Sequence, residues 1–135
     1  MISFNYQTKF SLQNEEKLAN WISLVIQSEG YTEGDLMYFF CDDDSLIKLN
    51  IEFLNHDTLT DIISFDYVIG KQLNGEIFIS VDRVRENSND LGVGFLEELH
   101  RVMIHGILHY CGYGDKSEEE IIVMRAKEDY YLNKI

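Results

Sequence analysis

The sequence predicts an α+β fold, in which a small mixed β-sheet of about four strands packs against helices within a single domain, residues 1–135. Two observations predict this class. Short segments with strand-like apolar patterning alternate along the chain with longer segments of helical periodicity. The chain has 135 residues, 45% of them hydrophobic, which is enough for one hydrophobic core. Because no repeat or low-complexity linker divides the sequence, one domain is expected.

The first half of the chain is expected to contain two strands and two helices. Residues 2–6 alternate apolar and polar side chains, as a half-buried strand does. A helix follows, with Asn14 as its N-cap. Residues 36–41 form a compact apolar run that predicts a buried strand, and Asp43 or Asp44 then caps a second helix. The expected inner faces comprise Leu18, Trp21, Ile22, Val25 and Ile26 in the first helix, and Leu46, Leu49, Ile51 and Phe53 in the second.

The second half is expected to begin with two strands, residues 61–68 and 76–81, joined in hairpin-like fashion through residues 70–75. A short helix over residues 81–89 follows, and Gly92 introduces a long helix. The buried stripe of that long helix is expected to comprise Leu96, Leu99, Met103, Ile104, Ile107 and Leu108.

A last helix is expected from Ser117 onward. Ser117 and Glu120 have the spacing of a capping box, in which each side chain bonds the backbone of the other residue. The acidic residues 118–120 also favour the positive end of the helix dipole. This helix completes the predicted domain.

The long helix carries the residues that indicate chemistry. His105 and His109 are four residues apart, so that their imidazoles lie on one face of the helix, one turn apart. Gly112 and Gly114 end the helix and let the chain double back, which brings Asp115 toward the same point. Two nitrogens and one carboxylate oxygen, with a coordination position left open, are typical of a catalytic metal site.

Other residues near this motif fit a site less well. His100 lies in the same helix but is rotated away from the ligand face, and Cys111 is better explained as a small buried residue than as a soft ligand. In zincin peptidases a glutamate that acts as general base directly follows the first histidine. Gly106 occupies that position here, so a peptidase is disfavoured.

Metal-assisted hydrolysis needs a general base, and Asp61 and Glu76 are the catalytic candidates, together with the acids that follow Asp115. Each also has a structural explanation. An aspartate at the start of a strand commonly bonds local backbone, and a glutamate within a strand is commonly exposed. The sequence does not choose between these explanations.

Several blocks of the chain, from about Leu49 onward, resemble the motifs of one family in their order and spacing. They are His105-Gly106-Ile107-Leu108-His109 with Gly112 and Tyr113, the pair Leu49-Asn50, Thr60-Asp61-Ile62-Ile63-Ser64-Phe65, and Gly75-Glu76-Ile77-Phe78-Ile79-Ser80. The family is the YbeY family of bacterial rRNA-maturation endoribonucleases.

This resemblance implies a zincin-like arrangement with the metal at the end of the long helix, bound by His105, His109 and Asp115. It implies a cytoplasmic, metal-dependent endoribonuclease that cuts single-stranded RNA in 16S rRNA 3′-end maturation and ribosome quality control. Zinc is the expected cofactor, and nickel or another transition metal would suit the same ligands. The expected partners are rRNA and the ribosome or a ribosomal protein, with no DNA and no membrane.

The chain departs from the family pattern at four positions. Asp115 replaces the third histidine and Gly114 the aspartate before it, while Leu54 replaces an arginine and Asp66 a proline. A carboxylate is a competent zinc ligand, so the site is expected to survive the first change. Loss of the arginine predicts weak turnover by the isolated protein, and a need for the ribosome or a partner.

The charge of the chain bears on its partners. With 24 acidic and 11 basic residues the formal net charge is −13, which argues against a stand-alone, nonspecific RNA binder. A second hypothesis is therefore a non-catalytic ribosome-assembly factor whose acidic surface binds a ribosomal protein. A third is a metal-dependent hydrolase of another substrate.

The sequence also suggests a cellular compartment. It has no apolar run near the roughly 20 residues that span a bilayer, and no secretory signal at its start. Two cysteines, Cys41 and Cys111, form no disulfide framework, which favours a reducing cytosol.

Overall fold

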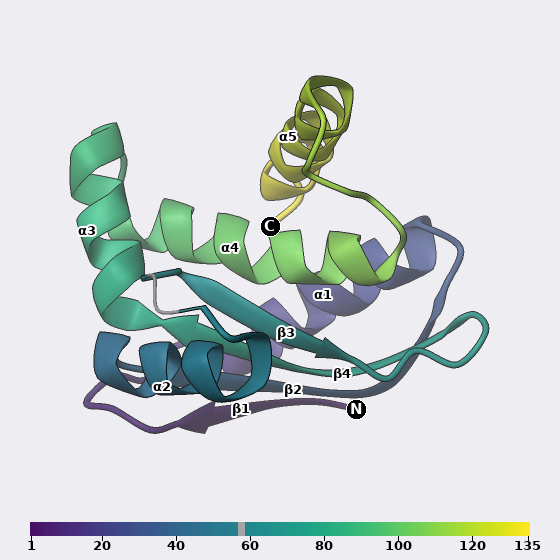
Figure 1. Ribbon diagram of the computed structural model, residues 1–135. Coiled ribbons are helices and arrows are strands. Elements are labelled where there is room, and N and C mark those ends of the chain that lie inside the picture. The colour runs from purple at the N-terminus through teal and green to yellow at the C-terminus, as the bar shows by residue number, and fades with distance from the viewer. Residues whose placement is uncertain (57–58) are drawn as a thin grey trace.

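A computed structural model of the protein, which describes residues 1–56 and 59–135, confirms the α+β class (Figure 1). The elements are, in chain order, β1 (Ile2–Tyr6), α1 (Glu15–Ser28), β2 (Thr32–Cys41), α2 (Asp43–Leu54), β3 (Ile62–Asp66), β4 (Gln72–Ser80), α3 (Val81–Leu91), α4 (Phe95–Tyr110) and α5 (Glu118–Leu132). None of the described helices is both long and apolar enough to cross a membrane.

The four strands form one mixed sheet in the order β1-β2-β4-β3. β2 pairs in parallel with both β1 and β4, and β3 pairs antiparallel with β4 at the edge. The hairpin between β3 and β4 turns at Gly70, whose φ of 59° is in the left-handed region. Gly75, which was predicted to be in the turn, instead lies within β4 opposite Asp66. β2 also begins earlier than predicted, because Thr32 pairs with Gln72.

The helices cover the two faces of the sheet unequally. α1, α3 and α4 pack their buried side chains on one face and form the main core with Leu36, Tyr38, Phe40, Ile77 and Ile79. α2 covers part of the other face, where Leu46 packs with Cys41 and Ile63. α5 packs on α4, on the side away from the sheet (Figure 1). Met124 and Tyr131 of α5 join the main core, so α5 extends that core over the face of α4 that lies away from the sheet.

α2 differs from the prediction in its cap and its inner side. Its N-cap is Asp42, not Asp43 or Asp44, and the Asp42 side chain accepts a hydrogen bond from the Ser45 backbone N–H at 2.8 Å. Ile51 is 49% exposed because it lies five residues, or about 140° of helical rotation, from the buried Leu46. Phe53 touches Phe65 edge-to-face but remains largely exposed.

The residues that were predicted to be buried in the long helix α4 are buried, with one exception. Leu96 is exposed, and Phe95 packs inward in its place, edge-to-face with Phe10. Further along, Gly106 lets α4 approach the sheet closely, since a Cβ there would lie 3.2 Å from the terminal methyls of Ile62 and Ile77. A glutamate at position 106 would therefore point into the sheet.

α5 is fixed to the rest of the molecule by polar contacts from α1 and from Glu29, which caps the C-terminal end of α1. The indole N–H of Trp21 donates to the Tyr131 carbonyl at 2.8 Å. The buried carboxylate of Glu29 accepts from Lys127, Tyr131 and Tyr113, the last at 2.6 Å. Although burial raises the pKa of Glu29, these donors outweigh it and leave that pKa below its ordinary value. The contacts set the position of α5 relative to α4.

Candidate metal centre

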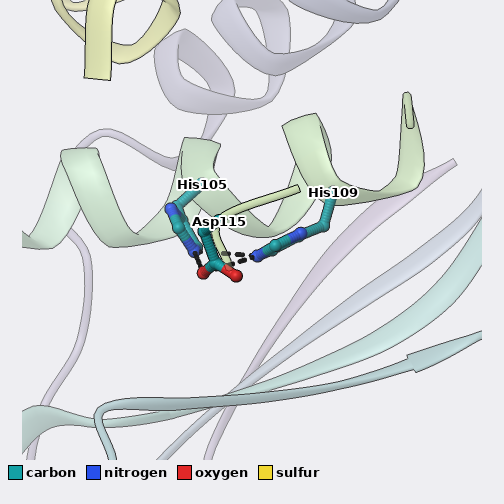
Figure 2. Close-up of side chains that lie close together, drawn as sticks. All are labelled: His105, His109 and Asp115. Carbon is teal, nitrogen blue, oxygen red and sulfur yellow. Dashed lines mark hydrogen bonds and ion pairs between the residues drawn. The ribbon is translucent and has the colours of Figure 1, made fainter. Parts of the chain in front are cut away.

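Three donor atoms meet beside the C-terminal end of α4, from His105, His109 and Asp115 (Figure 2). The two Nε2 atoms are 3.0 Å apart. The Asp115 Oδ2 atom lies 3.3 Å from Nε2 of His105 and 3.2 Å from that of His109. Among the residues that the structure describes, this is the one group of three or more histidine, cysteine or acidic side chains whose ligand atoms all lie close together.

These separations fit a bound cation. A tetrahedral zinc ion with ligands at about 2.0–2.1 Å holds neighbouring ligands roughly 3.3 Å apart. Lone pairs that point at one another at such distances repel unless a proton or a cation lies among them. The group could therefore bind a metal ion.

The chain turns at the end of α4 in a way that brings Asp115 back to the histidines. Gly112 has a φ of 98°, and the Tyr113 N–H donates to the Leu108 carbonyl, which is the bonding pattern of a Schellman motif. The predicted helix break at Gly112 is thus confirmed. Beyond it the predicted capping box of α5 is present between Ser117 and Glu120. The Glu120 carboxylate also accepts from the backbone of Lys116, so the segment that holds Asp115 is fixed at both ends.

A buried glutamate orients one of the histidines. Oε2 of Glu128 on α5 lies 2.7 Å from Nδ1 of His105, and Glu128 is only 5% exposed. An ionised carboxylate only accepts hydrogen bonds, so Nδ1 of His105 carries the proton. In neutral His105 the lone pair is then on Nε2, which faces His109 and Asp115. This is the carboxylate–histidine arrangement that supports histidine ligands in metal sites.

Arg101 holds the carboxylate of Glu128 in place beside His105. Its guanidinium donates to Glu128 at 2.9 Å and to Asp129 at 2.7 Å. Burial alone would lower the pKa of His105, but the hydrogen bond and charge of Glu128, with the charge of Asp115, raise it above its ordinary value. The site therefore attracts positive charge.

We call His105, His109 and Asp115 the metal group. This group opens on a pocket of about 310 Å³ between α4 and α5. It is lined by His105 and Asp115, by Asp61 and Ile62 where β3 begins, and by further residues of the two helices, namely Glu98, Arg101, Val102, Ile121, Met124, Arg125 and Glu128. Burial raises the pKa of the Asp61 carboxyl above its usual range. Burial, together with the charge of Asp61, does the same for Glu98. The pocket thus holds two carboxyl groups that retain protons more readily than exposed ones.

The structure brings Asp61 to this pocket but not Glu76. Ile77 contacts α4, and because side chains alternate along a strand, its neighbour Glu76 projects from the opposite face of the sheet. There Glu76 accepts a hydrogen bond from the Tyr67 hydroxyl at 3.1 Å. His100 packs against Trp21, and burial lowers its pKa.

The chain is similar to known proteins over nearly its whole length. The model of one family, described as Endoribonuclease YbeY, matches residues 2–135. The chain belongs to this family. An Endoribonuclease YbeY from Flavobacterium johnsoniae is 59% identical over 129 residues, which are 96% of this chain and 93% of that protein. Another, from Flavobacterium psychrophilum, is 57% identical over 98% of this chain and 94% of its own length.

The fold is also that of a solved structure. The solution structure of TM1509 from Thermotoga maritima has a TM-score of 0.70 and 28% identity to this chain, over 98% of this chain and 87% of that one. Membership of the YbeY family, predicted from the sequence blocks, is therefore confirmed, together with the fold class.

Replacing Glu128 by glutamine is expected to weaken metal binding by about 10- to 100-fold, the usual effect of losing a partner that orients a ligand. Glutamine keeps the shape of the side chain but removes the charge that holds the Nδ1 proton of His105. Competition of the purified variant with a zinc-responsive dye measures the change.

Asp129→Asn is the matched control. It removes the other ion pair of Arg101, but the Asp129 side chain is more than half exposed and does not belong to the metal group. Its zinc affinity should stay close to that of the wild type. Equal affinities in Glu128→Gln and the wild type would contradict the orienting role.

Proposed function

We propose that this protein is a zinc-dependent endoribonuclease that cuts single-stranded RNA, and that it acts in the cytoplasm in 16S rRNA 3′-end maturation and ribosome quality control. The observation that carries the proposal is the His105–His109–Asp115 group, two members of which line a pocket, in a chain of the Endoribonuclease YbeY family. Its partners would be rRNA and the ribosome.

His105, His109 and Asp115 would hold the ion through two imidazole nitrogens and one carboxylate oxygen. Zinc suits this mixed donor set, and nickel or another transition metal would be bound by the same atoms. A divalent ion held there would polarise a phosphodiester oxygen and lower the pKa of a water molecule bound to it. Asp115 in place of a third histidine leaves the ligand set less positive by one charge.

The remaining steps fall to the side chains of the pocket. Asp61 is the proposed general base, because it faces the pocket and its raised pKa brings it nearer to the pH at which it must accept a proton. Glu98, with its raised pKa, is placed to hold a proton nearby. Glu128 and Arg101 keep His105 in the tautomer that leaves Nε2 free.

The relatives at 59% and 57% identity are named as endoribonucleases, which favours catalysis over a purely structural role in ribosome assembly. The net charge of −13 remains unfavourable for RNA binding in general. It is compatible with an enzyme whose positive potential is concentrated at a metal ion and a few pocket side chains.

The test is cleavage of a synthetic RNA with the sequence of a precursor 16S rRNA 3′ end by the zinc-loaded protein. The single-stranded RNA should be cut, whereas the same segment annealed to its complement should not. A chelator should stop cleavage, and added zinc should restore it. Failure to cut the single strand, either free or within isolated small ribosomal subunits, would contradict the proposed activity.

A further inference from the structure

We propose that the pocket between α4 and α5 is a subsite for one nucleotide of the RNA, in which Arg125 binds a backbone phosphate next to the one that is cut. The inference rests on the proposed endoribonuclease activity and adds the place at which the protein binds the RNA beside the cut. It depends on three features of the pocket, namely its walls, its cations and its apolar surface.

The walls of the pocket are two helix faces that point at each other. α4 contributes residues 98, 101, 102 and 105, and α5 contributes residues 121, 124, 125 and 128. Both sets follow the i, i+3, i+4, i+7 spacing of a single helix face. The pocket therefore lies between the helices, and His105 and Asp115 of the metal group also line it, so an RNA chain bound at the metal group can extend into it.

The two arginines of the pocket differ in what they already bind. Arg101 is largely buried and donates to Glu128 at 2.9 Å and to Asp129 at 2.7 Å. Arg125 has a side chain that is 55% exposed, and its ion pair with Glu128 is long, at 3.7 Å. The Glu128 carboxylate is already bonded by Arg101 and His105 at shorter distances. Arg125 thus keeps donors available for a phosphate.

The local charge makes such a cation necessary. Asp61, Glu98 and Asp115 line the same pocket and would repel a phosphodiester. A guanidinium binds phosphate through two parallel hydrogen bonds, which suits a site where one group must hold and orient the chain. Arg125 is the exposed cation among the residues that line this pocket.

The pocket also has an apolar lining. Ile121 is half-exposed on α5, one helical turn before Arg125, and Ile62 and Val102 line the same pocket. A cation beside an apolar wall matches a nucleotide, whose phosphate is charged and whose base has apolar faces. Pockets that combine an apolar lining with a few placed polar groups are the usual form of small-ligand sites.

The experiment measures binding of a fluorescein-labelled, single-stranded RNA of ten nucleotides to the zinc-loaded protein by fluorescence anisotropy, at a series of KCl concentrations. Anisotropy is read directly after mixing, and a gel of the same samples shows that the RNA is still uncut, so that binding is measured by itself. Arg125→Gln is expected to raise the Kd about tenfold and to reduce the slope of log K against log salt by about 0.7, the value for one lost phosphate contact on a single strand. Arg125→Lys should keep the wild-type slope.

The matched control is Arg85→Gln, which removes an exposed arginine that lies over the Phe95 ring and outside the pocket. Its Kd and slope should stay within about twofold and about 0.2 of the wild-type values. No detectable binding by the wild type, or a slope and Kd unchanged in Arg125→Gln, would overturn the subsite. Failure of the endoribonuclease proposal is a separate result, since it is judged by cleavage with zinc.

Discussion

Replacing His109 by alanine is expected to remove both the bound metal and RNA cleavage. His105 and Asp115 would then be the remaining donors of the group, and two donors do not meet the three-ligand requirement of a catalytic zinc site. Because even the loss of a residue that orients a ligand costs about 10- to 100-fold in affinity or activity, loss of a ligand should exceed that range. Elemental mass spectrometry of the purified protein should find about one equivalent of metal in the wild type and none in the variant.

Two further variants make the result specific. His100→Ala removes a histidine from the same helix, and His100 packs on Trp21 away from the metal group, so this variant should retain the ion. Asp115→Ala should lose it. Metal lost from His109→Ala but kept by Asp115→Ala would show that another group supplies the third ligand. Metal or cleavage at the wild-type level in His109→Ala would contradict the site.

The parts of this site that sequence predicts are those set by local structure. The four-residue spacing of His105 and His109 fixes their common face in any α-helix. Gly112 marks the point where the chain takes a left-handed conformation, and the Ser117–Glu120 pair marks where the next helix begins. Between those two points few residues remain, so Asp115 has to return near the histidines.

The parts that sequence does not predict depend on packing between distant elements. Glu128 lies 23 residues after His105, and its role is set by how far α5 is rotated and shifted against α4. That position depends in turn on Trp21 and Glu29, about 100 residues earlier in the chain. Because α5 is rich in acidic residues, nothing in the sequence distinguishes the buried Glu128 from the glutamates of α5 that face the solvent.

Strand alternation separates the two predicted bases. Ile77 belongs to the main core, so its neighbour Glu76 must project from the other face of the sheet, away from α4. Asp61 comes just before β3, outside the regular alternation, and its place follows from the bond between its carbonyl and the Ser80 N–H at 2.9 Å. The first of these inferences was available from the pattern of β4, whereas the second requires the sheet register.

Replacing Asp61 by asparagine is expected to lower kcat by about 10²- to 10⁴-fold, the usual contribution of a general base. Asparagine keeps the size of the side chain and its ability to accept a hydrogen bond, but it does not accept the proton. Zinc content should be unchanged, because Asp61 is not among the three donors. Single-turnover cleavage of the 16S-derived RNA, with zinc measured in the same samples, tests this expectation.

The dependence of the cleavage rate on pH, compared between the wild type and variants of Asp61 and Glu76, identifies the base. Burial raises the pKa of Asp61, and a base works only when ionised, so the wild-type rate should rise with pH through that raised pKa. Asp61→Asn should lose this dependence at constant zinc content, whereas Glu76→Gln should retain it. If the pH dependence of the rate were lost in Glu76→Gln and kept in Asp61→Asn, Glu76 would be the general base.

Asp61→Asn, which is expected to lower the rate of cleavage, should raise the stability of the fold. Burial disfavours ionised Asp61, so the folded-state pKa lies above the unfolded one. The fold therefore loses stability as the pH rises from the unfolded pKa to the folded pKa, and the whole loss is present above the folded pKa. Metal-free Asp61→Asn should then be more stable than the wild type at neutral pH. The difference should shrink as the pH falls through the raised pKa, because neutral aspartic acid resembles asparagine. Urea unfolding at several pH values tests this, and a variant that is less stable at neutral pH would mean that Asp61 is kept for the fold rather than for catalysis.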